Sequence, residues 1–391
     1  MERIGIFGGS FDPPHIGHIQ AAQQAMEALC LDRLLLIPAN RVPHKQGDQT
    51  DAHHRLQMIR AAVAQRPGLE VSDLEIRREG ISYTVDTVQQ LREMHPDAML
   101  YLLMGSDMFL SFDSWKDGER ILAQTTLAVF CRGSKGEREK LDARKAELEK
   151  AGHSVCLIPN RVVDMSSTQL RRLLAFQCAE EFLPEGVGEY IRNHGLYHTD
   201  ANWKNLPMEE LERVVTALVD PKRVAHILGC RDTAIALAKR WGVDETDAAR
   251  AGLLHDITKA LDGPLQLTLC QGYGKVLDDF SRRYPKTLHA LTGSLVAQRI
   301  FGENEAVVAA IECHTTGKAA MNMLEKIIYV ADYMEPNRDF PGVEELRRLA
   351  YSDMDAALRC GLYMTLEHLA RQGAEVSPAS RQALEYLQIN V

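Results

Sequence analysis

Long apolar runs are missing from this chain of 391 residues, in which no stretch approaches the roughly 18 residues that a membrane-spanning helix needs. The first residues, MERIGIFGGSF, lack the succession of charged, apolar and small residues that marks a secretory signal. The eight cysteines are scattered without any C-x-x-C pair, which indicates reduced thiols rather than a disulfide framework. We therefore expect a cytoplasmic protein with no membrane partner.

An excess of positive charge is also missing, because 45 Lys and Arg stand against 54 Asp and Glu and give a formal net charge of -9. Nucleic-acid backbones are held by basic faces, so we expect no nucleic-acid partner. The charge balance still allows small anionic ligands, which need only a few local cations and backbone N–H groups.

The first half of the chain alternates between apolar segments and helical patterns. Strands are expected over residues 3–7, 33–38, 99–104, 127–131 and 155–158, and helices over 16–29, 53–65, 84–94 and 138–151. This succession predicts an α/β, Rossmann-like domain whose parallel sheet is covered on both faces. Ligands of such domains bind beyond the carboxyl ends of the strands.

The second half shows helical patterns and almost no strand signal. Helices are expected over residues 208–219, 222–241, 245–259, 288–301, 304–313, 324–334, 353–371 and 379–388. The stretch between the halves is polar and unpatterned. We predict an α/β domain over residues 1–198, a linker over 199–206 and an all-α domain over 207–391.

The stretch GGSFDPPHIGH follows the first expected strand and precedes a helical pattern. Gly8 and Gly9 would let a ligand approach the backbone closely, and a helix N-terminus is a ready site for phosphate. His15 and His18 could donate hydrogen bonds to phosphate oxygens, with or without a full positive charge. A tight turn with two surface histidines is the plain alternative. The grouping favours attack on phosphorus, where positioning and electrostatics supply most of the acceleration.

This stretch resembles the signature of the H-x-G-H nucleotidyltransferase superfamily, with Ser10 where Thr is common and Pro14 as a variation. Within that superfamily, residues 2–198 are most similar to the bacterial nicotinate-nucleotide adenylyltransferases. The stretches that carry this similarity include PHK, ISYTVDTV, LMGSDMFLSFDSWKD and DMSSTQLR. Pantetheine-phosphate adenylyltransferases and cytidylyltransferases are weaker matches, because they lack the pair formed by ISYTVDTV and GSD…W.

The resemblance implies transfer of AMP from ATP to nicotinate mononucleotide with Mg²⁺, without a covalent intermediate. It implies His15, His18, Lys45 and Arg171 as catalytic residues. The implied ATP-binding residues are Gly8, Gly9, Phe11, His15, His18, Asp107, Ser167, Thr168 and Arg171, and those for nicotinate mononucleotide are Lys45, Tyr83, Thr84 and Trp115. Two of these assignments have structural alternatives. The SST stretch could be a plain helix cap, and Trp115 could be a core residue.

The helical half carries a second group of candidate residues. His255 and Asp256 lie within an apolar helical pattern, and so does Asp332. An ionised carboxylate in such surroundings is costly unless it is paired or bound to a metal. Isolated buried histidines are usually core residues, but five such sites in the order H…HD…H…H…D favour a metal centre. Mixed imidazole and carboxylate ligands suit Fe, Mn or Zn.

The order of these residues resembles that of the HD-domain phosphohydrolases of the YqeK type, over about residues 207–388. The family implies two Fe ions, with Mn or Zn as alternatives, and symmetric cleavage of diadenosine tetraphosphate into two ADP. The implied ligands are His226, His255, Asp256 and Asp332 for the first metal, and His289 and His314 for the second, with Asp256 as bridge and catalytic residue. Lys259 and Arg338 are expected to hold phosphates.

We therefore predict a bifunctional enzyme with an adenylyltransferase half and a hydrolase half. The alternative is that the helical half is a non-catalytic module that senses nucleotides and regulates the first half. The expected partners are small nucleotides: ATP, nicotinate mononucleotide and diadenosine tetraphosphate. The sequence leaves open whether the chain forms a homo-oligomer.

Overall fold

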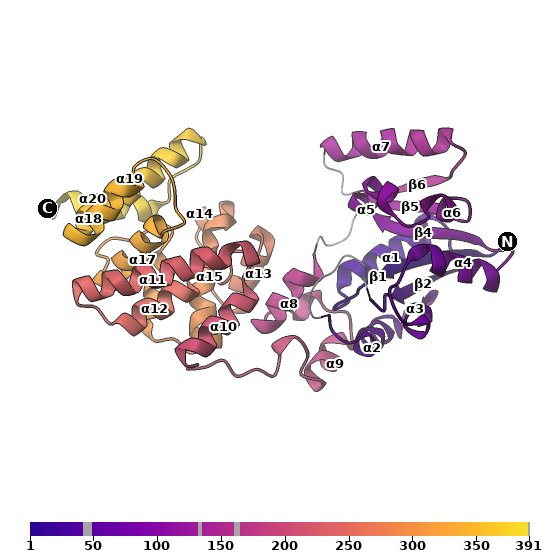
Figure 1. Ribbon diagram of the computed structural model, residues 1–391, viewed down its shortest axis with the longest axis horizontal. Coiled ribbons are helices and arrows are strands. Elements are labelled where there is room, and N and C mark those ends of the chain that lie inside the picture. The colour runs from indigo at the N-terminus through magenta and orange to yellow at the C-terminus, as the bar shows by residue number, and fades with distance from the viewer. Residues whose placement is uncertain (42–48, 132–134, 160–164, 390–391) are drawn as a thin grey trace. The chain divides into compact units, whose positions relative to one another are not determined.

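The computed structural model describes residues 1–41, 49–131, 135–159 and 165–389. The chain divides into two compact units, Met1–Asp200 and Ala201–Val391 (Figure 1). Trp203 and Asn205, expected in the linker, pack within the second unit. The Trp203 ring stacks on Phe301 with the centroids 5.8 Å apart, and the Asn205 N–H donates to the Phe301 carbonyl at 2.9 Å.

The first unit is built around a parallel sheet of six strands in the order β3-β2-β1-β4-β5-β6 (Figure 1). The strands are β1 (Arg3–Gly9), β2 (Arg33–Pro38), β3 (Leu69–Val71), β4 (Met99–Gly105), β5 (Thr126–Cys131) and β6 (Val155–Pro159). The chain moves from β1 outward through β2 and β3 and then returns to β4, on the other side of β1. The strand order therefore reverses between β1 and β4, which is where ligands bind in sheets of this kind.

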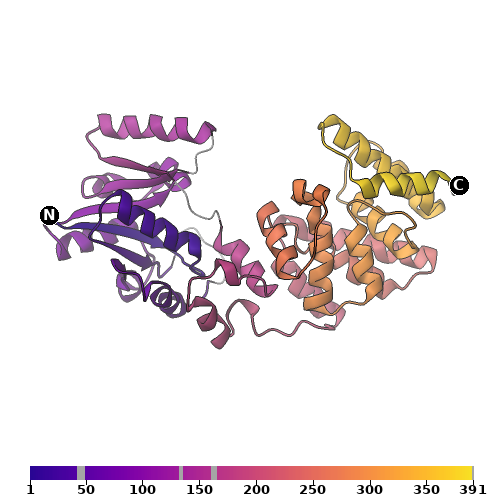
Figure 2. The same cartoon turned by 180° about the vertical axis from the view of Figure 1, so that it is seen from behind.

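Helices cover both faces of this sheet. They are α1 (Ile16–Ala28), α2 (Ala52–Val63), α3 (Leu74–Arg78), α4 (Thr84–Met94), α5 (Ser106–Leu110), α6 (Gly118–Leu122), α7 (Lys135–Lys150), α8 (Ser167–Ala175) and α9 (Val187–Asn193). One core lies between the sheet and the helices α4 to α7, with Val88, Phe109 and Leu141 among its fully buried residues. Helix α1 lies in front of the sheet in the view of Figure 2.

The second unit is helical throughout its described part, residues 201–389. Its helices are α10 (Met208–Leu218), α11 (Val224–Trp241), α12 (Glu245–Leu254), α13 (Gly263–Gly272), α14 (Asp279–Arg283), α15 (His289–Val296), α16 (Glu305–Cys313), α17 (Met323–Met334), α18 (Val343–Ser352), α19 (Met354–Arg371) and α20 (Pro378–Ile389). None of the helices in the described ranges is long and apolar enough to span a membrane.

Side-chain caps fix the start of two helices that lead to the second group of candidate residues. The Asp244 carboxylate accepts hydrogen bonds from the N–H groups of Thr246 and Asp247 at 2.8 and 2.9 Å, and thereby starts α12. Asn322 and Glu325 cap α17 reciprocally: each side chain accepts from the other residue's N–H, at 3.0 and 2.9 Å. Because the caps fix where the helices begin, they also fix the position of His255 relative to α12 and of Asp332 within α17.

The structure corrects the expected elements in several places. Strand β3 was not expected, because it has three residues of which only Leu69 is buried. The helices α13, α14 and α18 were also not expected. The helix expected over 245–259 ends at Leu254, so His255 and Asp256 lie in the turn that follows it. The helix expected over 288–301 is α15 followed by a π-helical turn, Ala297–Phe301.

Candidate functional site

The glycine-rich loop lies at the carboxyl end of β1, where the strand order reverses. Phe11 has a left-handed backbone with φ of 47° and a buried ring. A Cβ atom at Gly9 would lie 3.1 Å from that ring, so close packing explains the glycine at this position. Gly8 is exposed, and a Cβ there would meet nothing within 4 Å. The backbone at Gly8 is thus open to a ligand.

His15 and His18 lie together at the start of α1. Their ring centroids are 3.6 Å apart, and the backbone N–H of His15 donates to His18 Nδ1 at 3.2 Å. The neutral His18 ring therefore carries its proton on Nε2. Burial lowers the pKa of the His15 imidazole to about 4, so this ring is uncharged near pH 7. Of the two forms left open for His15, the structure favours the neutral donor.

The N-terminus of α8 borders the same loop, although it lies more than 150 residues further along the chain. The Ser167 hydroxyl donates to the Pro13 carbonyl at 3.1 Å. The Arg171 guanidinium donates to the Asp12 carbonyl at 2.7 Å and to the Thr168 hydroxyl oxygen at 3.2 Å. The helix cap is Ser166, whose hydroxyl oxygen accepts from the Gln169 N–H at 3.2 Å. The side chains of Ser167, Thr168 and Arg171 are therefore not needed as the cap and face the loop.

Two further side chains hold this loop, and sequence reasoning missed both. Arg55 in α2 is 1% exposed and donates to three carbonyls, those of Ser10, Asn40 and Thr50, at 2.9, 3.0 and 2.8 Å. The Tyr197 hydroxyl donates to the Asp12 carboxylate at 2.7 Å. The sequence did contain a signal for Arg55, because this arginine lies on the apolar face of an amphipathic helical pattern. A charge at such a position is buried only when it is fully hydrogen-bonded.

The remaining residues of the first group are spread around the carboxyl ends of β1, β2 and β4. Asp107 is exposed in α5, directly after β4. Tyr83 and Thr84 form the start of α4, and the Lys116 ammonium lies 4.3 Å from the centre of the Tyr83 ring. Lys45 lies outside the described residues, so its expected role stays a prediction.

Trp115 has features of both roles considered for it. Its ring is half-buried and packs against the core, with the Phe112 ring centroid 5.2 Å away. It also lines a cavity of about 290 Å³ together with residues that include Arg144 and His153. Trp115 therefore anchors in the core and still presents part of its surface to an open space.

The six candidate metal ligands of the second unit come together from five segments of the chain. His226 lies in α11, His255 and Asp256 follow α12, His289 begins α15, His314 follows α16 and Asp332 lies in α17. Four of them are almost completely buried: His255 at 0%, Asp256 at 2%, His289 at 2% and His314 at 0% exposure. Such burial of imidazole and carboxylate groups in one place requires partners of opposite charge or a metal.

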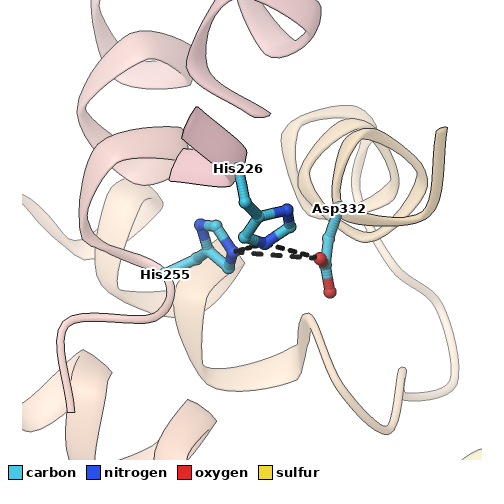
Figure 3. Close-up of side chains that lie close together, drawn as sticks. All are labelled: His226, His255 and Asp332. Atoms are coloured by element: carbon cyan, nitrogen blue, oxygen red, sulfur yellow. Dashed lines mark hydrogen bonds and ion pairs between the residues drawn. The ribbon is translucent and has the colours of Figure 1, made fainter. Parts of the chain in front are cut away.

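Three of these residues form the first set (Figure 3). His226 Nε2 lies 3.2 Å from Asp332 Oδ1 and 3.3 Å from His255 Nε2, and the third side of the triangle, from His255 Nε2 to Asp332 Oδ1, is 3.9 Å. Metal–ligand bonds of about 2.0–2.2 Å place neighbouring ligand atoms roughly 3–3.5 Å apart. All three atoms fall within 4.8 Å of one another and could hold one ion.

Asp256 lies between this set and a second one. Its Oδ2 faces His226 Nε2 and His255 Nε2 at 3.6 and 3.5 Å. Its Oδ1 faces His289 Nε2 and His314 Nε2 at 3.4 and 3.6 Å and has no hydrogen-bond donor among the described residues. Burial would raise the pKa of Asp256, but His255, His226 and His314 hold it well below its usual range. An ionised carboxylate with one oxygen toward each set fits a bridging ligand.

The histidines share one orientation, with Nε2 toward the centre and Nδ1 bonded to an oxygen. The Nδ1 partners are Gly252 O for His255 (2.8 Å), Lys286 O for His289 (2.9 Å), Ile311 O for His314 (2.7 Å) and Glu335 Oε1 for His226 (3.1 Å). Because these oxygens only accept, each Nδ1 carries the proton and leaves the Nε2 lone pair to a metal. Bonds of this kind orient metal-binding histidines in general. Glu335, which is 1% exposed, was missed from the sequence.

Three cationic side chains surround the centre. Lys259 Nζ donates to His289 Nε2 at 2.7 Å, and an Arg338 guanidinium nitrogen donates to Asp332 Oδ1 at 2.6 Å. Arg223 donates to Asp256 Oδ2. Lys259 and Arg338 were expected here as phosphate ligands, and the structure brings both to the centre. Arg223 was not singled out from the sequence.

Comparison with known proteins separates the same two halves. Residues 6–173 match the family model described as cytidylyltransferase-like, and residues 223–337 match the HD domain model. A probable nicotinate-nucleotide adenylyltransferase of Gemmatimonas aurantiaca is 44% identical over 198 residues, which are 50% of this chain and 92% of the relative. One of Thermus thermophilus is 41% identical over 196 residues, 50% of this chain and 99% of the relative.

A solved structure corresponds to about half of the chain. It is a predicted HD superfamily hydrolase involved in NAD metabolism from Clostridium acetobutylicum, with 36% sequence identity and a TM-score of 0.47, and it covers 48% of this chain and 99% of its own. The two family models, the relatives of the first half and the parallel sheet confirm the family resemblances and the fold class expected from the sequence. An HD domain implies a divalent metal. The chain belongs to the nicotinate-nucleotide adenylyltransferase family through its first half and carries an HD domain in its second half.

Proposed function

We propose that the first half transfers AMP from ATP to nicotinate mononucleotide. A phosphate oxygen of the mononucleotide attacks the α-phosphorus of ATP, the bond from this phosphorus to the bridging oxygen breaks, and pyrophosphate leaves. The observation that carries the proposal is the pair of stacked histidines at the start of α1, bordered by the N-terminus of α8. The similarity of this half to relatives described as probable nicotinate-nucleotide adenylyltransferases supports the choice of substrates.

The residues of this half position the reactants and stabilise charge. His18 offers its Nε2–H, and His15 offers a neutral ring, to oxygens around the α-phosphorus. Ser167, Thr168 and Arg171 extend the same site toward the outer phosphates. A bound Mg²⁺ would spread the charge of the leaving pyrophosphate. Preorganised donors of this kind supply much of the rate enhancement in such transfers.

The choice of acceptor tests this assignment. Nicotinate mononucleotide should be used with higher kcat/KM than the nicotinamide form, because a site that binds a carboxylate leaves donors unpaired with an amide. Trp115→Ala should raise KM for the mononucleotide more than for ATP, since stacking contributes about 1–3 kcal/mol per ring. Equal efficiency with both mononucleotides would contradict the carboxylate site, and an unchanged KM would assign Trp115 to the core alone.

For the second half we propose metal-dependent, symmetric hydrolysis of diadenosine tetraphosphate to two ADP. The observation that carries it is Asp256, whose two oxygens face two separate sets of imidazole nitrogens. We infer two Fe ions as native metals, with Mn or Zn as alternatives, since mixed nitrogen and oxygen ligands suit these ions. When bound, such ions lower the pKa of water and stabilise both the attacking and the leaving oxygen.

The side chains around the centre then hold the substrate. Lys259 and Arg338 carry positive charge beside the ligands and would bind the polyphosphate. Water attacks the second phosphorus from one end of the chain, the bond to the central bridging oxygen breaks, and each product is ADP. Glu335 orients His226 through the bond to Nδ1.

Chromatography of the early products tests the proposal in the full chain loaded with Mn²⁺ or Fe²⁺. ADP should be the sole nucleotide product, and Asp256→Ala should abolish turnover and reduce bound metal. ATP plus AMP would contradict the symmetric mechanism. Full metal occupancy without hydrolysis would favour the alternative, a nucleotide-sensing module. All six candidate ligands are present in the sequence, which favours catalysis, because a degenerate sensor would be expected to have lost at least one ligand.

A further inference from the structure

Tyr197 has an unusual backbone conformation for an aromatic residue. It lies in the short helical turn Leu196–His198, which follows α9, and its φ of 57° and ψ of 34° are left-handed. His198 is left-handed as well, with a φ of 65°. Such a conformation costs about 1–3 kcal/mol for a residue other than glycine and persists only where other contacts hold it. This turn therefore depends on contacts that its side chains make elsewhere in the unit.

The side chain of Tyr197 reaches back to the loop after β1. Its hydroxyl donates to Asp12 Oδ1 at 2.7 Å, and the Asp12 side chain is only 7% exposed. Burial, followed by the charge of the nearby Asp12, raises the pKa of the Tyr197 hydroxyl above its ordinary value. The hydroxyl therefore keeps its proton near pH 7 and is a permanent donor to this carboxylate.

The other carboxylate oxygen of Asp12 lies close to Arg171. Asp12 Oδ2 accepts from the Thr50 N–H at 3.4 Å and lies 3.9 Å from Arg171 Nη1. Arg171 makes no hydrogen bond to this oxygen, because its Nη1 donates to the Asp12 carbonyl at 2.7 Å and its Nη2 donates to Thr168 at 3.2 Å. The Arg171 side chain is 37% exposed, so a phosphate group can still reach the guanidinium.

A rotation of the Asp12 carboxylate would convert this arrangement into a direct ion pair with Arg171. A carboxylate and a guanidinium form two parallel hydrogen bonds when both oxygens are free, but Tyr197 holds Oδ1 of Asp12. Arg55 also lies near Asp12, but each of its three guanidinium nitrogens already donates to a carbonyl. Arg171 is therefore the cation that a released carboxylate would bind.

We propose that Tyr197 is a positioning residue for adenylyl transfer. By holding Asp12 Oδ1, its hydroxyl keeps the carboxylate from turning onto Arg171 and leaves this guanidinium to the outer phosphates of ATP. Without the hydroxyl, Asp12 and the triphosphate compete for the same cation, and a buried carboxylate that has lost a donor competes strongly. This inference rests on the proposed adenylyltransferase function and adds a residue that acts through Asp12 rather than on a substrate.

The first measurement compares Tyr197→Phe with the wild type in steady-state kinetics of the full chain. The substitution keeps the ring and removes one oxygen. We expect KM for ATP to rise about tenfold, the loss typical of one charge-assisted pair, while KM for nicotinate mononucleotide changes less than about twofold. Tyr190→Phe is the matched control, because it removes a hydroxyl that lies 2.9 Å from His54 Nδ1 in the same unit, and both constants should stay at their wild-type values. Equal increases of both KM values in Tyr197→Phe would overturn the proposal.

The second measurement is a double-mutant cycle with Arg171→Gln. Because Tyr197 acts through Arg171 in this proposal, Tyr197→Phe should have no further effect on KM for ATP when Arg171→Gln is already present. Additive effects of the two substitutions would overturn the proposal and leave Tyr197 with a purely structural role. If Tyr197→Phe does not fold, Tyr197→His, whose ring retains a donor, takes its place in the same cycle.

The same cycle is measured without turnover by calorimetric binding of ATP with Mg²⁺. The chains for this measurement carry Asp256→Ala, so that the proposed hydrolase centre is inactive. The ATP affinity should fall about tenfold in Tyr197→Phe and should not fall further when Arg171→Gln is already present. This pattern of ATP binding in a chain that transfers no AMP would contradict the proposed function alone. Equal ATP affinities with and without Tyr197→Phe would contradict this inference alone.

Discussion

At the scale of single residues, one hydrogen bond decides which ring nitrogen of His18 can donate. Its Nδ1 accepts the His15 N–H, which leaves Nε2–H as its donor at the helix N-terminus. A donor fixed in advance acts mainly on charge that develops in the transition state.

His18→Ala should therefore lower kcat about 10²–10³-fold, the usual loss for one preorganised donor, with a smaller effect on KM. Steady-state kinetics with ATP and nicotinate mononucleotide measure both constants. His53→Ala, at an exposed position in α2, serves as the control and should behave like the wild type. A near-normal kcat with a strongly raised KM would mean that His18 only binds ground-state ATP.

His15 makes the first half sensitive to acid. Its folded-state pKa of about 4 lies below the ordinary value of 6.5, so the unfolded chain binds the proton more readily. The contribution of the neutral ring to the free energy of unfolding is fully present above pH 6.5. It is lost as the pH falls toward 4, and about 1.4 kcal/mol of it is lost at pH 5.5. Urea unfolding at pH 7.5 and 5.5 should show this loss in the wild type and not in His15→Asn. In NMR spectra, the His15 ring should remain neutral at pH 5.5.

At the scale of elements, Arg55 joins α2 to three loop carbonyls, and two of these, Asn40 and Thr50, flank residues 42–48. Arg55→Met should leave these carbonyls without their donor and lower the free energy of unfolding of the first half by about 2–4 kcal/mol. Chemical denaturation measures this, and adenylyl transfer should fall in parallel. Arg60→Met changes an exposed arginine on the same helix and is the matched control. Equal effects of both substitutions would remove the special role of Arg55.

The elements also explain how far the sequence could predict the molecule. Strands buried on both faces, such as β1 and β4, stand out as apolar runs, whereas β3 has too few residues to leave a pattern. Metal ligands could be predicted because His and Asp in an apolar pattern are costly by themselves. Arg223 and Glu335 could not, because charged residues near helix ends are ordinary and only the fold shows what they contact.

At the scale of the whole molecule, each unit contains all of the described side chains that form its own site. The six candidate metal ligands, for example, all belong to the second unit. We expect the chain from residue 200 onward to hydrolyse diadenosine tetraphosphate with a rate close to that of the full chain. Assays on this fragment and on residues 1–200 measure the two activities separately. Loss of hydrolysis in a folded fragment with bound metal would indicate that the first half contributes to the second reaction.

The contact between Tyr197 and Asp12 has a consequence for the order in which the protein is made. It joins the loop after β1 to the last turn of the first unit, 185 residues later. A ribosome must therefore synthesise almost the whole unit before this hydrogen bond to the loop can form. The metal centre is completed later, because Asp332 is 131 residues beyond Ala201. Synthesis of these residues takes about 7–26 s at 5–20 residues per second. During that interval a nascent chain can already carry a complete adenylyltransferase site, while its His226 and His255 still lack the Asp332 carboxylate.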